Sequence, residues 1–110
     1  MLMKISRNGE SGKLTVFMEG ELDQHSAKTY ISEIEILLDK YLPRDLCIDM
    51  RNMSFMDSSG IAIILKANRK MNMLGGKMCI ENVQNQPLRV LDASGIDRLI
   101  NVKTGREVTT

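Results

Sequence analysis

Residues 45–78 decide the fold, and they read DLCIDMRNMSFMDSSGIAIILKANRKMNMLGGKM. Residues 45–50 form an apolar run that suits a strand buried on both faces. Residues 51–56 are more polar, and we expect a loop there. A second apolar run over 77–81 predicts another buried strand. Because strands joined by a helix form a right-handed crossover, the two strands should be parallel.

A helix is predicted between these two strands. Asp57 or Ser58 is placed to cap its N-terminus, and Gly75-Gly76 supplies a left-handed stop. The serines at 58 and 59 therefore lie where free backbone N–H groups and the positive end of the helix dipole favour an added phosphate. Apolar residues at offsets of three and four predict one buried face, made of Gly60, Ile63, Ile64, Ala67, Met71 and Leu74.

The N-terminal part of the chain predicts a β-hairpin followed by a helix. Strands are expected over 3–7 and 13–19, joined by a glycine-containing loop over 8–12. Asp23 is a plausible N-cap for the helix. The apolar face of that helix consists of Ala27, Tyr30, Ile31, Ile34, Leu37, Leu38 and Tyr41.

The C-terminal part predicts a short third helix with Pro87 at its first position and a stop at Ser94-Gly95. A last apolar cluster follows, and residues 103–110 suit a short strand or a loose tail. The cluster consists of Ile96, Leu99, Ile100 and Val102.

The element order β-β-α-β-α-β-α predicts one α/β domain over residues 1–110, a small mixed sheet with an N-terminal hairpin and helices packed against it.

The charged residues are scattered along the chain, with a net charge of +1, and aromatic residues are few, so we expect no nucleic-acid partner. With no signal peptide or membrane-length apolar run, we expect a cytoplasmic protein. Cys47 and Cys79 lack the close spacing of a zinc or redox motif, so we predict buried reduced thiols and no metal site.

A catalytic serine needs a nearby base, and His25 is the only histidine in the chain. The serine segment also lacks the glycine of a nucleophile elbow, which disfavours a hydrolase. Asp23, Asp49 and Asp57 could gather at the carboxyl ends of neighbouring strands, but no phosphate-binding loop accompanies them. From spacing alone, capping is favoured over phosphorylation for Asp57 and Ser58.

Met53, Phe55 and Met56 lie in the expected loop before the serines. Methionines of this kind more often fill a core. Apolar side chains on a loop beside a charged cap nevertheless indicate a docking surface.

Several motifs in fixed order closely resemble the STAS domain of bacterial anti-sigma factor antagonists. The resemblance covers the chain from about Met3 to Val102. The motifs are Gly20-Glu21-Leu22-Asp23, the run 46–50 with Asn52 and Phe55, Met56-Asp57-Ser58-Ser59-Gly60, Gly75-Gly76 and Ser94-Gly95-Ile96. Members of that family usually end in an amphipathic helix, whereas residues 103–110 lack its apolar spacing.

The resemblance implies a partner-switching protein with no catalytic residues. Its unphosphorylated form would bind an anti-sigma factor that is itself a serine kinase, and so release a sigma factor. Phosphorylation at Ser58, with Ser59 as second choice, would end the complex, and a metal-dependent serine phosphatase would reset it. No cofactor is implied, with weak nucleotide binding left open. The implied partner-binding residues are Asp23, Met53, Phe55, Met56, Asp57, Ser59 and Gly60.

Two alternatives remain open at this point. One is a STAS module that does not switch and serves as a scaffold or sensor subunit. The other, more remote, is a small serine hydrolase.

Overall fold

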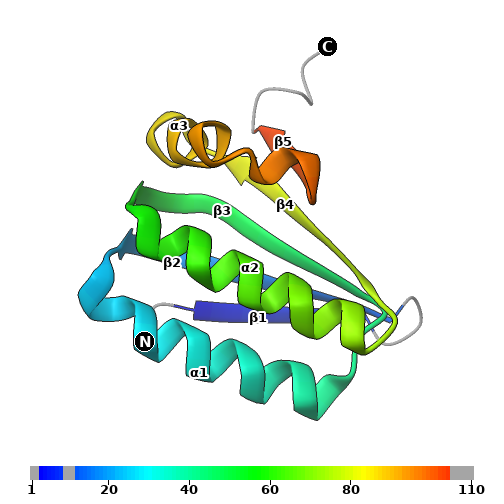
Figure 1. Cartoon of the computed structure of the whole chain (residues 1–110). Coiled ribbons are helices and arrows are strands. Elements are labelled where there is room, and N and C mark those ends of the chain that lie inside the picture. The colour runs from blue at the N-terminus through cyan, green and yellow to red at the C-terminus, as the bar shows by residue number, and fades with distance from the viewer. Residues whose placement is uncertain (1–2, 9–11, 105–110) are drawn as a thin grey trace.

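A computed structural model describes residues 3–8 and 12–104, with side chains described from residue 12 onward. Five strands form one sheet in the order β1-β2-β3-β4-β5, with helices packed against it (Figure 1). In chain order the elements are β1 (Met3–Asn8), β2 (Lys13–Leu22), α1 (Gln24–Tyr41), β3 (Asp45–Met56), α2 (Ser58–Met73), β4 (Lys77–Val83), α3 (Asn85–Ser94), the 3-10 helix η1 (Ile96–Arg98) and β5 (Asn101–Thr104).

The sheet is mixed, as the sequence predicts. Strand β1 pairs antiparallel with β2, whereas β2, β3, β4 and β5 are parallel to their neighbours. Helices α1 and α2 lie side by side across one face of the sheet (Figure 1). The crossovers β2-α1-β3 and β3-α2-β4 therefore confirm the predicted parallel units.

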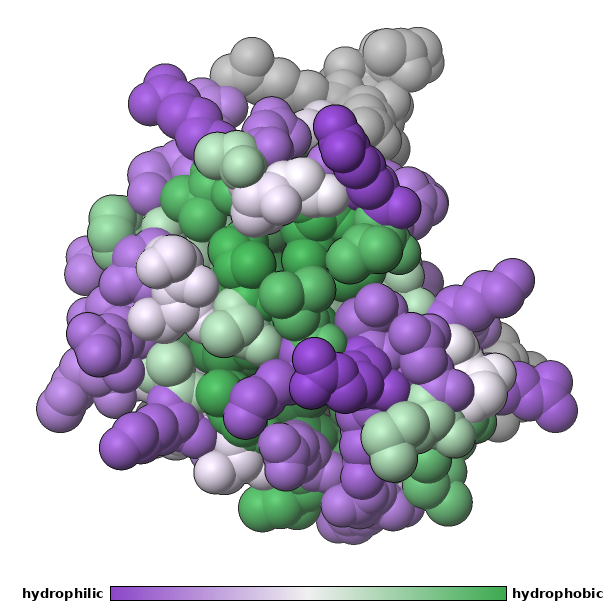
Figure 2. Space-filling model, viewed as in Figure 1, coloured by the Kyte–Doolittle hydropathy of each residue, from purple (hydrophilic) through white to green (hydrophobic). Residues whose placement is uncertain are grey.

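The core lies between this face of the sheet and the two helices. In β2 and in the first half of β3, alternate residues point toward the helices, because side chains alternate between the faces of a sheet. Tyr30 of α1 also donates a hydrogen bond to the backbone oxygen of Glu19 at 2.9 Å, which ties the helix to β2. Apolar side chains show in the middle of the face seen in Figure 2, with hydrophilic side chains around them. The buried core residues of the first strands and helices include Leu14, Val16, Met18, Ala27, Ile34, Leu38, Leu46, Ile48, Ile63, Ile64 and Met71.

The predicted loop over residues 51–56 is wrong, because β3 continues to Met56. β3 leaves β4 after Asp49 but stays paired with β2, with register shifts, up to the partners Leu22 and Met56. β2 pairs with one edge of these residues, and the side chains of Gln84 and Gln86 bond to backbone groups on the other edge, so a mixed polar and apolar sequence still forms a strand.

Smaller corrections concern the C-terminal third. Pro87 is the third residue of α3, not the first; its missing N–H costs nothing there, since the first helical turn has no intrahelical acceptors for its donors. Leu99 is 66% exposed and Leu74 is exposed as well, so neither joins the core as expected.

The expected tail begins as strand β5, which ends at Thr104. The remainder of the expected tail, and most of the loop expected over 8–12, lie outside the described residues. Among the described residues, none of the helices is long and apolar enough to cross a membrane.

Candidate functional site

The N-terminus of α2 presents an exposed serine beside an acidic cap. Asp57 is the N-cap, and its Oδ1 accepts a hydrogen bond from the backbone N–H of Ser59 at 2.8 Å. Ser58 is the first helical residue and is exposed, whereas Ser59 is half-buried. The hydroxyl of Ser58 therefore lies at the positive end of the helix dipole and is open to another protein.

A second acidic cap lies at the start of α1. Asp23 and Ser26 form a capping box, in which Ser26 N donates to Asp23 Oδ1 at 2.9 Å and Asp23 N donates to Ser26 Oγ at 3.2 Å. The backbone hydrogen bond from Ser26 lowers the pKa of Asp23, so this half-buried carboxylate is charged at neutral pH. The cap predicted from sequence is confirmed.

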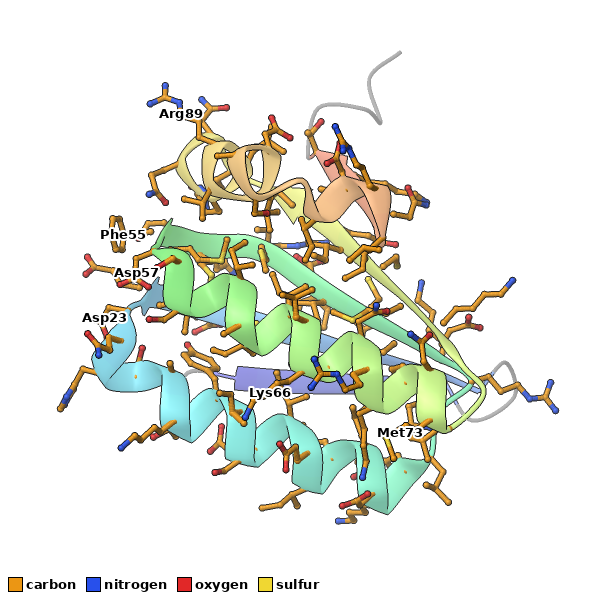
Figure 3. The ribbon with its side chains drawn as sticks, viewed as in Figure 1. Asp23, Phe55, Asp57, Lys66, Met73 and Arg89 are labelled. Atoms are coloured by element: carbon orange, nitrogen blue, oxygen red, sulfur yellow. The ribbon has the colours of Figure 1, made fainter. Side chains whose placement is uncertain are left out.

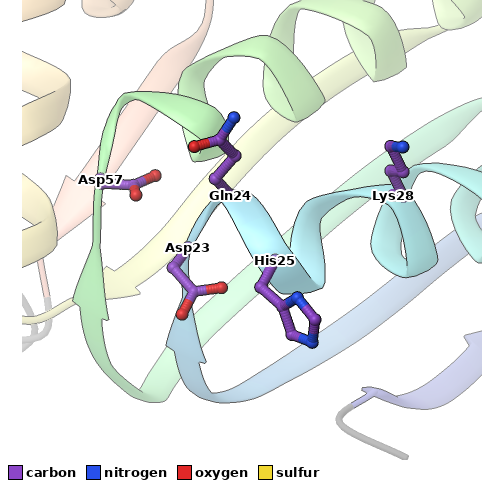
Figure 4. Close-up of a pocket in the computed structure, with 5 residues that line it drawn as sticks. All are labelled: Asp23, Gln24, His25, Lys28 and Asp57. Atoms are coloured by element: carbon purple, nitrogen blue, oxygen red, sulfur yellow. The ribbon is translucent and has the colours of Figure 1, made fainter.

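The two caps meet in one open hollow. The backbone N–H of Asp57 donates to Leu22 O at 3.1 Å, which holds the start of α2 against the end of β2. Asp57 comes from the start of α2, and the other lining residues come from the first turns of α1 (Figure 4). The hollow has a volume of about 670 Å³ and is lined by Asp23, Gln24, His25, Lys28 and Asp57. Two carboxylates, a lysine and a histidine make this a polar surface suited to contact with a charged partner.

Phe55 adds an apolar side chain to the same end of the molecule. Figure 3 shows Asp23, Phe55 and Asp57 close together, far from Met73 at the C-terminal end of α2. Phe55 is 39% exposed. We call the surface formed by Asp23, Phe55, Asp57 and Ser58 the docking end.

Three of the residues expected to bind a partner do not offer side chains to one. Met53 and Met56 are 0% exposed and belong to the core. The expectation of exposed methionines is wrong because residues 51–56 form a strand, and the register shifts in its pairing with β2 interrupt the simple alternation, so that both Met53 and Met56 are buried. Gly60 is also buried: a Cβ there would lie 2.3 Å from Met56 Cγ and Sδ and 3.0 Å from Leu22 Cδ2. Its role is close packing of α2 against the strand ends.

Helix α3 supports the docking end through a contact that the sequence did not reveal. Gln86 Oε1 accepts from Met56 N at 2.8 Å, and Gln86 Nε2 donates to Met56 O at 3.0 Å. Gln84 Nε2 also donates to Arg51 O. These side-chain amides replace β4 as partners of β3 beyond the point where the two strands separate. The pairing was not predictable because no local pattern links Gln86 to a residue 30 positions earlier.

Asp49 does not join Asp23 and Asp57, since β3 runs seven residues beyond it. Asp49 is 2% exposed, and its carboxylate accepts hydrogen bonds from Arg51 N (2.9 Å), Arg51 Nη2 (2.9 Å) and Asn82 Nδ2 (2.8 Å). Burial alone would raise the pKa of Asp49, but the bonds from Arg51 and Asn82 outweigh it and hold the pKa below its ordinary value. Asp49 therefore has a structural role in the sheet.

These features define a small mixed-sheet α/β domain whose candidate site is an exposed, acid-flanked serine at a helix N-terminus. Residues 4–109 match the sequence profile of the STAS domain. The chain belongs to the STAS domain family.

Known proteins similar to this chain agree with that assignment. A relative from Paenibacillus polymyxa, named anti-sigma F factor antagonist, is 28% identical over 102 residues, which span 93% of this chain and 87% of the relative. The structure of the anti-sigma factor antagonist SpoIIAA in its unphosphorylated form matches with a TM-score of 0.78 at 20% identity, covering 97% of this chain and 92% of that one. The phosphorylated form of the Bacillus cell fate determinant SpoIIAA matches with a TM-score of 0.69 at 20% identity, covering 97% and 96%. At this identity the two structures establish a shared fold.

Proposed function

We propose that this protein is an anti-sigma factor antagonist whose unphosphorylated docking end binds an anti-sigma factor, and that phosphorylation of Ser58 ends the complex. The observation that carries the proposal is the exposed Ser58 at the first position of α2, directly beside the cap Asp57. The family assignment and the relative named anti-sigma F factor antagonist support the class of partner.

Charge explains how one modification would switch binding. A phosphate adds about −1.5 to −2 charges at neutral pH, and on Ser58 it would stand beside Asp57 and near Asp23, both of which line the hollow. Like charges brought together at an interface cost several kcal/mol. Since each 1.4 kcal/mol or so weakens binding about tenfold, phosphorylation would dissociate a complex of moderate affinity.

The kinase and phosphatase belong to the proposal as well. The anti-sigma factor would transfer the γ-phosphate of ATP to Ser58, and a metal-dependent phosphatase would remove it. This chain would then be a substrate in the cytoplasm, with no catalytic role of its own. A covalent serine-directed probe that labelled Ser58 or Ser59 would instead favour the hydrolase alternative.

The test is phosphorylation by the cognate anti-sigma factor with ATP, followed by mapping of the phosphate by mass spectrometry. We expect modification of Ser58 and its loss in Ser58→Ala. Ser54→Ala is the matched control, because Ser54 is another exposed serine four residues earlier. Ser58→Ala should bind constitutively, and Ser58→Asp should bind at least about tenfold more weakly. Stable binding by the phosphorylated protein would contradict the switch and favour a module that does not switch.

The docking end can be tested separately. Phe55→Ala should weaken the unphosphorylated complex about tenfold or more, because exposed aromatic side chains at interfaces carry a large share of binding energy. Met73→Ala is the control, since Met73 is 77% exposed and lies at the other end of α2 (Figure 3). Equal affinities of the two variants in isothermal titration calorimetry would place the interface elsewhere.

A further inference from the structure

The sheet brings together two cysteines that are far apart in the sequence. Cys47 of β3 and Cys79 of β4 are register partners in the parallel ladder. Glu81 follows two residues later on β4 and so points to the same face as Cys79. The two sulfur atoms and a carboxylate oxygen of Glu81 all lie within 4.8 Å of one another. The Cys79 Sγ to Glu81 Oε1 distance is 3.8 Å.

This cluster lies on the sheet face opposite α1 and α2. Leu46 and Ile48 belong to the core beneath the helices, so Cys47, which stands between them, points the other way. Cys47 is 0% exposed, whereas Cys79 and Glu81 are half-buried. Both cysteines are free thiols. The cluster is therefore sheltered on one side and reachable from solvent at Cys79 and Glu81.

Two thiolates and a carboxylate form a donor set that Zn²⁺ and related thiophilic ions accept. Bonds of about 2.3 Å to sulfur and about 2.0–2.2 Å to oxygen place tetrahedral ligand atoms roughly 3.3–3.8 Å apart. Ligand atoms within 4.8 Å of one another need to approach by only about 1 Å, which side-chain rotation can supply, and water would complete the shell. Lys13 Nζ lies 3.9 Å from Glu81 Oε1. This long ion pair would break when the Glu81 carboxylate binds the metal ion.

We propose that Cys47, Cys79 and Glu81 form a binding site for a thiophilic divalent ion of the zinc class. About ten residues of β3 separate Cys47 from the start of α2, which at roughly 3.3 Å per residue puts the site roughly 30 Å from Ser58. The site is thus independent of the docking end, and metal binding can be tested without any partner protein.

The test is a titration of the reduced, metal-free protein with Cd²⁺ and Zn²⁺. We expect a thiolate-to-cadmium charge-transfer absorption band that saturates at one ion per chain, and the same stoichiometry for Zn²⁺ by native mass spectrometry. Loss of a residue that only supports a ligand costs about 10–100-fold in metal affinity, so Cys79→Ser and Cys47→Ala should each cost at least about 100-fold. Glu81→Gln should also weaken binding, while Glu35→Gln, a matched change on the exposed side of α1, should not.

Circular dichroism verifies that each variant folds. Because Cys47 is fully buried, its substitution could disturb folding, whereas Cys79 and Glu81 are half-buried and their variants avoid this problem. Absence of the charge-transfer band, or unchanged affinity in Cys79→Ser, would overturn the proposal. The proposal would also be overturned if the reduced protein bound no ion but its mass fell by that of two hydrogen atoms on exposure to air. That result would assign the pair to disulfide chemistry.

Discussion

At the residue scale, Gly60 shows how packing sets the start of α2. An alanine in a helix interior usually stabilises a protein relative to glycine, by up to about 1 kcal/mol. At this position the added Cβ would lie 2.3 Å from the Met56 side chain, so Met56 must shift within a filled core.

We therefore expect Gly60→Ala to lower the free energy of unfolding by about 1–3 kcal/mol, the usual cost of overpacking. Urea denaturation followed by circular dichroism measures the change. An increase in stability would mean that Met56 relocates freely, in which case the contact does not position the helix.

The buried carboxylate of Asp49 gives a pH dependence at the same scale. Its pKa in the folded protein is lowered from 3.8, so its stabilising contribution is fully present above about pH 4 and is lost as the pH falls through the lower, folded pKa. Asp49→Asn should lower the free energy of unfolding at pH 7 by about 1.5–3 kcal/mol, since the bonds lost are to a charged group.

This difference between wild type and Asp49→Asn should shrink on acidification to pH 3 and below, as measured by urea denaturation at each pH. Asp45→Asn is the control, because Asp45 is exposed in the same strand, and its effect should stay within about 0.5 kcal/mol. A difference in the free energy of unfolding that stays constant with pH would show that the charge of Asp49 contributes nothing to stability.

At the scale of the elements, α3 acts as a support for the last residues of β3. The Gln86 amide makes two hydrogen bonds to the Met56 backbone, where β4 no longer offers a partner. Removing the amide leaves a backbone donor and acceptor unpaired beside a buried residue, which is costly.

Gln86→Ala should lower the free energy of unfolding by about 1–3 kcal/mol and increase hydrogen exchange at the Met56 amide. Asn85→Ala is the matched control, because Asn85 is an exposed neighbour in the first turn of α3. Unchanged exchange at Met56 in Gln86→Ala would show that the strand end is held by its pairing with β2 alone.

At the scale of the whole molecule, the proposed switch works without unfolding. Ser58 is exposed at the positive end of α2, and that end offsets part of the cost of an added negative charge, by typically 0.3–1 kcal/mol. Ser58 is not among the buried core residues.

The phosphorylated protein and Ser58→Asp should therefore keep free energies of unfolding within about 1 kcal/mol of the unmodified protein. Chemical-shift changes should be confined to the first turns of α1 and α2. A decrease of several kcal/mol in the free energy of unfolding on phosphorylation, measured by thermal denaturation, would indicate a switch that works by local unfolding.

Much of the fold was predictable because its signals are local. The cap Asp23, the start of α2 at Asp57 and Ser58, the buried faces of α1 and α2 and the left-handed stop at Gly75 follow from spacings of a few residues. The resemblance to STAS domains rests on such motifs, and the family match confirms it. The strand over 51–56 was missed, since its polar residues resemble a loop until β2 is placed beside it.

The sequence by itself determined the element order from β1 to α3, the Asp23 cap and the start of α2 at Asp57 and Ser58, because hydrogen bonding and periodicity within a few residues specify them. Only the tertiary structure decided that Met53 and Met56 are buried, that Gln86 supports Met56 and that Cys47 lies beside Cys79. These outcomes depend on strand register and on contacts between segments about 30 residues apart. Register is set by how the whole sheet and its helices pack together.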